Sequence, residues 1–427
     1  MSKPTLSHTK TALLGLQHMF AMFGATILVP LLSGLDVSVT LISVGIGTLI
    51  FHLMTKGRIP AFLGSSFAFL VGIQLITDPE NGLFAGTNLT QSEKLAYATG
   101  AILVSSIVYL LVAILVKLMG PGKFMKMLPP VVTSPTVILI GIMLAPFAIN
   151  QSANNLFLAL TTLVLVIGSS VWGKGMVKIV SILIGIGGAY IVALIMHSLG
   201  MTNANGSAIL DFSASAEAAI VGLPPFMLPR FNVMAIVLML PFALATVAEH
   251  VGDIVALSAI TGEDFIKDPG LTRTLLGDGL ASAFSGLIGG PASITYGENV
   301  GVVALTKVTN PRVVQVAAVY TALLGFSPLV ATVIRTVPAA IIGGASFMLY
   351  GMIAAVGIRN LVEAKVDISK TKNLTVIAVM MVTGLGLRFA NPIVFSVGGT
   401  NVPIDRLGIA IAVVVGVFLN WILPEED

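Results

Sequence analysis

The chain has 427 residues, of which 56% are hydrophobic and only 10% are charged. Since an ordinary soluble domain carries about 25% charged residues, this composition excludes a water-soluble protein and indicates an integral membrane protein. The net charge of +3 comes without a basic tract, which excludes nucleic-acid binding, and the absence of cysteine excludes disulfides, thiolate metal ligands and a cysteine nucleophile.

Apolar stretches recur along the whole chain, and about 20 such residues are enough for a helix to cross a bilayer. They predict fourteen transmembrane segments, at residues 12–33, 37–55, 61–77, 95–116, 130–147, 155–172, 178–199, 232–257, 275–289, 291–306, 312–333, 338–357, 373–390 and 406–423. No polar block is large enough for a second domain. We therefore predict a single all-α membrane domain over residues 1–427.

The distribution of Lys and Arg predicts the orientation, because short cytoplasmic loops collect these residues. With both termini in the cytoplasm, only five of the 22 Lys and Arg residues fall on the outer side: Lys94, Arg230, Arg335, Arg388 and Arg406. We expect a multi-pass protein of the plasma or inner membrane with both termini cytoplasmic.

The longest predicted outer segment, residues 200–230, separates seven membrane segments from seven others. Because seven is an odd number, the second half must enter the membrane with inverted topology. A seven-plus-seven inverted repeat is typical of secondary transporters.

The third and tenth segments are apolar but poorly suited to a continuous helix. The third contains Pro60, Gly64 and paired serines, and the tenth begins Gly289-Gly290-Pro291. Each predicts a short β-strand followed by a half-helix whose N-terminal N–H groups face the middle of the membrane. Two ordinary kinked helices are the alternative.

Three carboxylates, Glu249, Asp253 and Glu298, lie in segments that otherwise suit a bilayer interior. A charge at that depth costs at least a few kcal/mol, so such residues normally handle ions or substrates, and we predict transport. Burial favours the uncharged carboxyl, which makes Glu249 a candidate proton carrier; a purely structural acid is the alternative. Asp253 follows one helical turn later on the same face and either shares in proton coupling or only orients Glu249 or the backbone of the tenth segment.

Four motifs in these segments resemble those of the nucleobase/ascorbate transporters, also called nucleobase:cation symporters of the second type. They are Gln17-His18, Gly64-Ser65-Ser66-Phe67, Ala248-Glu249-His250-Val251-Gly252-Asp253, and Glu298-Asn299-Val300-Gly301 continuing to Thr306-Lys307. The last fits the family signature Glu/Gln-Asn-x-Gly-x4-Thr-Lys/Arg, and the resemblance runs essentially from end to end.

The resemblance implies a division into two subdomains. The core, spans 1–4 and 8–11, corresponds to residues 12–116 and 232–333, and the gate, spans 5–7 and 12–14, to residues 130–199 and 338–423. The core would hold the substrate and move against the gate. Homodimers are common in the family.

The resemblance also bears on the substrate. Uracil permeases carry Glu at the position of Glu298, where xanthine and urate permeases usually carry Gln, and a carboxylate suits the ring N–H groups of uracil. Asp253 points the other way, because the most similar uracil permeases have His there and purine-type members often have Asp. We predict uracil or a close pyrimidine, with a xanthine- or urate-type purine permease as the alternative.

Aromatic and glycine residues complete the predicted substrate site. Phe67 and Tyr296 suit stacking on a flat heterocycle, although plain packing is the alternative. Gly297 adjoins Glu298 at the expected half-helix N-terminus. Tyr350 matches a gate residue that closes over substrate in the family.

Five further residues are predicted to support the site: Ser66, His18, His250, Asn299 and Asp278. His18 and His250 lie in motifs, and either ligation or a satisfied core histidine fits them. Asp278, near the cytoplasmic end of its span, is expected to organise helix ends.

We expect proton-coupled symport with no cofactor and no metal. No ATP site is expected either, since no Walker motif with its lysine occurs. Carboxylates and exposed carbonyls also bind Na⁺, so the sequence leaves sodium coupling open. Two rival classes remain. An intramembrane hydrolase using Asp253 and Asp278 would leave the broken helices unexplained, and a channel could also be lined by acids in contact with water.

Overall fold

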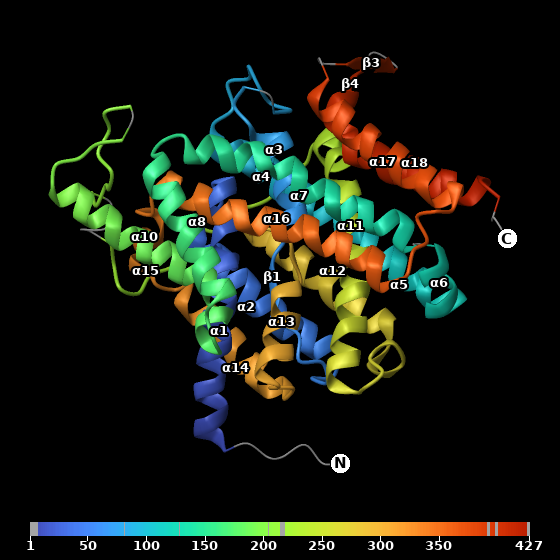
Figure 1. Ribbon diagram of the computed structural model, residues 1–427, viewed down its shortest axis with the longest axis horizontal. Coiled ribbons are helices and arrows are strands. Elements are labelled where there is room, and N and C mark those ends of the chain that lie inside the picture. Colours follow the sequence, from blue (N-terminus) through green and yellow to red (C-terminus); the bar gives the residue numbers. More distant parts are fainter. Residues whose placement is uncertain are drawn as a thin grey trace.

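The computed structural model describes residues 7–80, 82–127, 129–203, 205–213, 218–390, 393–397 and 400–424. These residues form a bundle of helices with two small two-stranded sheets (Figure 1). The first half contains α1 (His8–Ser33), α2 (Val37–Met54), β1 (Leu63–Ser65), α3 (Phe67–Thr77), α4 (Gln91–Ser105), α5 (Ile107–Met119), α6 (Pro121–Met127), α7 (Pro130–Ser152), α8 (Leu156–Val171), α9 (Met176–Ile179) and α10 (Ser181–Ser198). The second half contains α11 (Val233–Thr261), η1 (Ile266–Gly270), α12 (Leu271–Ile288), β2 (Ser293–Thr295), α13 (Gly297–Thr306), α14 (Pro311–Leu324), α15 (Pro328–Arg335), α16 (Ala339–Glu363), α17 (Thr371–Phe389), β3 (Val394–Val397), β4 (Thr400–Pro403), η2 (Ile404–Leu407) and α18 (Gly408–Ile422).

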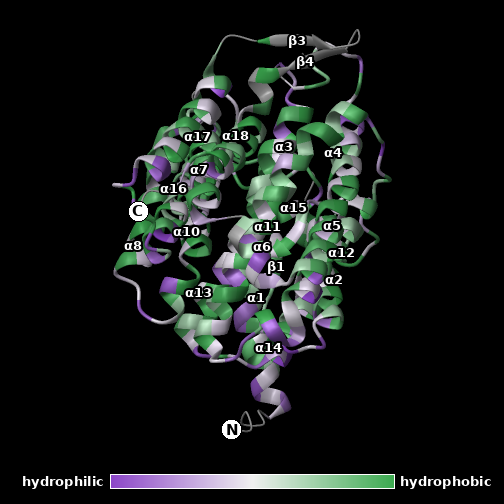
Figure 2. Cartoon of the chain, turned by 90° about the vertical axis from the view of Figure 1, so that its right-hand side faces the viewer, coloured by the Kyte–Doolittle hydropathy of each residue, from purple (hydrophilic) through white to green (hydrophobic). Residues whose placement is uncertain are grey.

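The helices have the length and composition of membrane spans. Within the described residues, eight are long and apolar enough to cross a bilayer, or up to nine if α14 and α15, bent by 83°, form one span. Large apolar side chains are exposed on their outer faces, as with Leu111 and Leu118 of α5. Hydrophobic residues predominate along the bundle (Figure 2). The chain is therefore a multi-pass membrane protein.

The two broken segments pair with each other. β1 and β2 run antiparallel, with Leu63 opposite Thr295 and Ser65 opposite Ser293. Each strand leads into a short helix, α3 or α13. The predicted pair of short strands, each followed by a half-helix, is thus confirmed, and the alternative of two kinked helices is wrong.

Side chains satisfy the strand groups that the ladder leaves free, as irregular backbone in a membrane protein requires. The Leu63 N–H donates to the Thr48 hydroxyl at 3.0 Å. The Ser282 hydroxyl donates to the Ser293 carbonyl at 2.8 Å. At the end of β1, the Ser66 N–H donates to the Ala292 carbonyl at 2.9 Å, and the Ser66 side chain caps α3.

Gly64 lies in β1, opposite Ile294 of β2, and its lack of a side chain allows the two strands to pair closely. A Cβ atom at this position would lie 2.6 Å from three ring atoms of Tyr296, closer than packed atoms can approach. The absence of a side chain at Gly64 therefore leaves the space that the Tyr296 ring occupies.

Two features differ from the sequence prediction. The segment expected as one helix over 312–333 breaks after Leu324, because Pro328 has no N–H to donate to the helical ladder. The segment between the last two spans, for which no strand was predicted, contains the β3–β4 hairpin.

Substitution of Gly64 by Ala should destabilise the protein, because the added methyl group overlaps the Tyr296 ring. Overpacking of this kind costs about 1–3 kcal/mol. Thermal unfolding in detergent should show a lower melting temperature for Gly64→Ala. Gly187→Ala in α10, where an added Cβ meets nothing within 4 Å, is the matched control. Equal melting temperatures for the two variants would contradict this account.

Candidate functional site

A small cavity lies where the two strand-helix segments meet α11, α7 and α16. Its volume is about 40 Å³, enough for a few water molecules. Its lining residues are Ser66, Phe67, Ala68, Val137, Ile140, Glu249, Ile294, Tyr296, Glu298 and Ile353. The predicted residues Ser66, Phe67, Glu249, Tyr296 and Glu298 are therefore brought together here.

The polar side of the cavity combines hydrogen-bond acceptors with donors. Glu249 comes from α11, and Glu298 lies in the first turn of α13. The N-termini of α3 and α13 bring backbone N–H groups and the positive end of each helix dipole to the same place. Carboxylates that accept and amides that donate can together bind a flat molecule that presents both kinds of group along one edge.

Two buried aromatic rings line the cavity, and a third packs against one of them. Phe67 and Tyr296 line it, and each is less than one-tenth exposed. Tyr350 of α16 packs edge-to-face on Phe67, with ring centroids 6.4 Å apart and planes at 74°. Tyr350 thus contacts the site through Phe67 without lining the cavity itself.

Asp253 lies beside the cavity, facing the start of α13. A Cβ atom on Gly297 would lie 3.6 Å from Asp253 Oδ1, so the carboxylate sits against the backbone at that helix N-terminus. Its buried Oδ2 atom has no hydrogen-bond partner within the described part of the chain. Asp253 therefore lies against the start of α13, whereas Glu249, one turn earlier on α11, lines the cavity.

A buried network holds the end of β2 in place. The Thr295 N–H and hydroxyl donate to the two carboxylate oxygens of Asp278, each at 2.8 Å. The His250 Nδ1 atom lies 2.8 Å from the same carboxylate, and its Nε2 lies 2.8 Å from the Thr274 hydroxyl. Asp278, which was expected to organise helix ends, thus bonds to the end of β2 and to His250.

The remaining motif residues lie outside the cavity. His250 has hydrogen-bond partners at both ring nitrogens, so neither nitrogen is free to bind substrate. Asn299 donates to the Pro60 carbonyl at 2.9 Å and so ties α13 to the chain that enters β1. The His18 Nδ1 atom donates to the Leu14 carbonyl at 3.2 Å within α1.

Sequence reasoning missed six residues. Ala68, Val137, Ile140, Ile294 and Ile353 line the cavity, but an aliphatic residue in an apolar segment gives no signal that separates it from ordinary packing. Thr295 was detectable as a polar residue inside a broken span.

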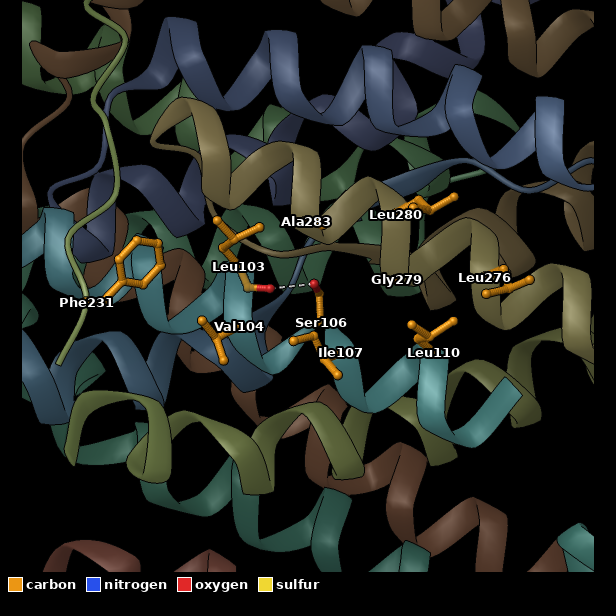
Figure 3. Close-up of a pocket in the computed structure, with 10 residues that line it drawn as sticks. All are labelled: Leu103, Val104, Ser106, Ile107, Leu110, Phe231, Leu276, Gly279, Leu280 and Ala283. Atoms are coloured by element: carbon orange, nitrogen blue, oxygen red, sulfur yellow. Dashed lines mark hydrogen bonds between the residues drawn. The ribbon is translucent and has the colours of Figure 1, made fainter. Parts of the chain in front are cut away.

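A larger cavity of about 370 Å³ lies between α4, α5 and α12 (Figure 3). Its lining is Leu103, Val104, Ser106, Ile107, Leu110, Phe231, Leu276, Gly279, Leu280 and Ala283. The Ser106 hydroxyl, its one polar side chain, already donates to the Leu103 carbonyl at 2.6 Å. This cavity therefore lacks the groups needed to recognise a polar molecule. Across the described ranges, no cluster of three or more His, Cys, Asp or Glu is arranged to hold a metal ion.

Comparison with known proteins gives consistent matches. The model of a permease family named for xanthine and uracil matches residues 9–393. The chain is 39% identical to the uracil permease of Bacillus subtilis (strain 168), over 96% of this chain and 92% of that protein. It is 34% identical to the uracil permease of Escherichia coli (strain K12), over 98% and 94%. The transmembrane domain of the cyanobacterial bicarbonate transporter BicA has a similar structure, with a TM-score of 0.64, 16% identity and 98% coverage of both chains. At that identity the similarity shows the fold alone, a transporter fold built from helices.

Substitution of Asp278 by Asn should destabilise the protein and loosen β2. The amide NH₂ group cannot accept the hydrogen bond that one Thr295 donor now makes, and a buried donor without a partner costs about 1–3 kcal/mol. The melting temperature in detergent should fall. Asp268→Asn, which removes an exposed ion pair with Arg58, should change it little. An Asp278→Asn protein as stable as the Asp268→Asn control would exclude a structural role for the network.

Proposed function

The chain belongs to the xanthine/uracil permease family, and from this premise we propose that it imports uracil, or a close pyrimidine, together with protons by alternating access. It is a transporter and not an enzyme, because the family is one of permeases. The observation that carries the proposal is the cavity in which Glu249 and Glu298 meet the N-termini of α3 and α13.

The chemistry of uracil complements the groups that line this cavity, which must widen to admit the ring because about 40 Å³ holds only a few water molecules. The ring presents two N–H donors and two carbonyl acceptors. Glu298 and Glu249 would accept from the N–H groups, and the N-terminal amides of the half-helices would donate to a carbonyl. Phe67 and Tyr296 supply faces on which the ring can stack. The names of the relatives, uracil permeases with 34% and 39% identity, support the same substrate.

A purine such as xanthine is the second candidate. Asp253 favours it, because the resemblance associates Asp at this position with purine-type members, and the carboxylate adjoins Gly297 at the site. Glu298 favours the pyrimidine, since purine permeases usually carry Gln there. Glu298 lines the cavity, whereas Asp253 lies beside it without lining it. We therefore favour a pyrimidine over a purine as the substrate.

Glu249 is the proposed proton carrier. Its carboxyl is half-buried in a membrane-spanning helix and shares the cavity with Glu298, so two negative charges there oppose each other. Protonation from the outside would remove one charge, prepare the site for a neutral base and reduce the cost of moving the core past the gate. Release inside and deprotonation would reset the carrier. Asp253 is proposed to assist this coupling, and Na⁺ remains the alternative ion.

We propose fourteen membrane segments in a seven-plus-seven inverted repeat. The nine long candidates would be joined by five shorter or less apolar helices, which are α3, α8, α12, α13 and α18. The core would comprise residues 12–116 and 232–333, and the gate residues 130–199 and 338–423. Both termini would be cytoplasmic in the plasma or inner membrane, and the protein would act as a homodimer.

Glu249→Gln should uncouple transport from protons, because the amide cannot carry one. In proteoliposomes with an imposed pH gradient, accumulation of uracil should be lost, while exchange of labelled for unlabelled uracil continues. The control is Glu363→Gln, an exposed residue of α16 that pairs with Arg359. Gradient-driven accumulation by Glu249→Gln would show that Glu249 is not the proton carrier.

Glu298→Ala should weaken uracil binding. A hydrogen bond to a charged group contributes about 1.5–3 kcal/mol, so Kd should rise roughly tenfold or more. Equilibrium binding to the purified protein measures this, with Glu363→Ala as the control. Unchanged uracil affinity would remove Glu298 from the recognition site.

A further inference from the structure

The two sides of the site cavity differ in chemistry. The carboxylates and helix N-termini all come from α3, α11 and the β2–α13 segment. The strand-helix segments also contribute Ala68 and Ile294, whereas α7 and α16, which pack on each other, contribute only aliphatic side chains: Val137 and Ile140 from α7 and Ile353 from α16. This aliphatic wall, defined as Val137, Ile140 and Ile353, contains no side-chain hydrogen-bond donor or acceptor.

This asymmetry orients a pyrimidine. The polar groups of uracil run from N1 through C2 and N3 to the C4 carbonyl, and only the C5–C6 edge carries nothing but C–H. A polar group turned toward the aliphatic wall would lose its hydrogen bonds with water and gain none. The polar edge therefore faces the carboxylates, and the C5–C6 edge faces the wall.

We propose that the aliphatic wall is the selectivity filter of the site: it accepts the C5–C6 edge of a single pyrimidine ring and excludes rings extended at that edge. The proposal rests on the function proposed above. Thymine carries a methyl group at C5, and xanthine has an imidazole ring fused across the same two carbons. The imidazole N–H would also lie against side chains that cannot accept it.

The packing of α7 on α16 keeps the wall in position. A Cβ atom on Gly141 would lie 2.6 Å from the Tyr350 carbonyl and the Ala354 nitrogen. A Cβ on Gly357 would lie 2.7 Å from the Ser134 carbonyl. Such close contact leaves the two helices little freedom to separate. Val and Ile are also branched at Cβ and stiff about χ1, so the wall cannot adjust easily to a larger ring.

The test removes one methyl group from the wall and adds one to the ligand. Ile140→Val and Ile353→Val lie on different helices, so one remains informative if the other folds poorly. The matched control is Ile138→Val, since Ile138 packs against Gly357 instead of lining the cavity. Labelled uracil bound to each purified protein is competed with unlabelled thymine and uracil, and the ratio of the two inhibition constants is recorded.

The ratio of thymine to uracil inhibition constants should fall roughly tenfold in at least one wall variant, as one methyl group in a close-fitting pocket allows. It should stay constant in Ile138→Val. An unchanged ratio in both wall variants, or an equal fall in the control, would overturn the selectivity wall. Failure of the unaltered protein to bind uracil would instead overturn the proposed function, so the two failures are distinguishable.

Discussion

The antiparallel pairing of β1 with β2 is the interaction on which the rest of the molecule depends. Backbone that leaves the helical ladder inside a membrane protein must find its hydrogen bonds within the protein, because lipid provides none. The two strands make part of these hydrogen bonds with each other, in a register that pairs Leu63 with Thr295 and Ser65 with Ser293. The hydroxyl groups of Thr48 and Ser282 supply more.

The site follows from this pairing. Since each strand ends where a half-helix begins, the pair brings the N-termini of α3 and α13 to one cavity. Asp278 and His250 fix the end of β2 from behind, and Asn299 ties α13 to the chain before β1. Five polar residues at and around the cavity therefore fall into two groups. Glu249 and Glu298 face the cavity, whereas Asp278, His250 and Asn299 hold the framework.

Local chemistry in the sequence was enough to predict the broken spans and the residues of the polar side. Pro60, Gly64 and the Gly289-Gly290-Pro291 run cannot continue a helix, and an acid such as Glu249 is too costly in a bilayer to be incidental. The partner of Asp278 could not be predicted, because Thr295 lies seventeen positions away and only the strand pairing fixes its direction. The aliphatic wall could not be predicted from the sequence either, since hydropathy does not distinguish Ile140, which lines the cavity, from Ile138, which packs against Gly357. The expected single helix over 312–333 failed because one proline outweighed a continuous apolar pattern.

The central claim is that uracil binds between the two half-helices with its ring N–H groups on the carboxylates. An experimental structure of the protein with uracil bound tests it most directly. The account predicts the ring between the N-termini of α3 and α13, with Glu249 and Glu298 within hydrogen-bond distance of ring nitrogens and the C5–C6 edge toward Ile140 and Ile353. Uracil bound elsewhere in the bundle, or with its C5–C6 edge toward the two carboxylates, would contradict it.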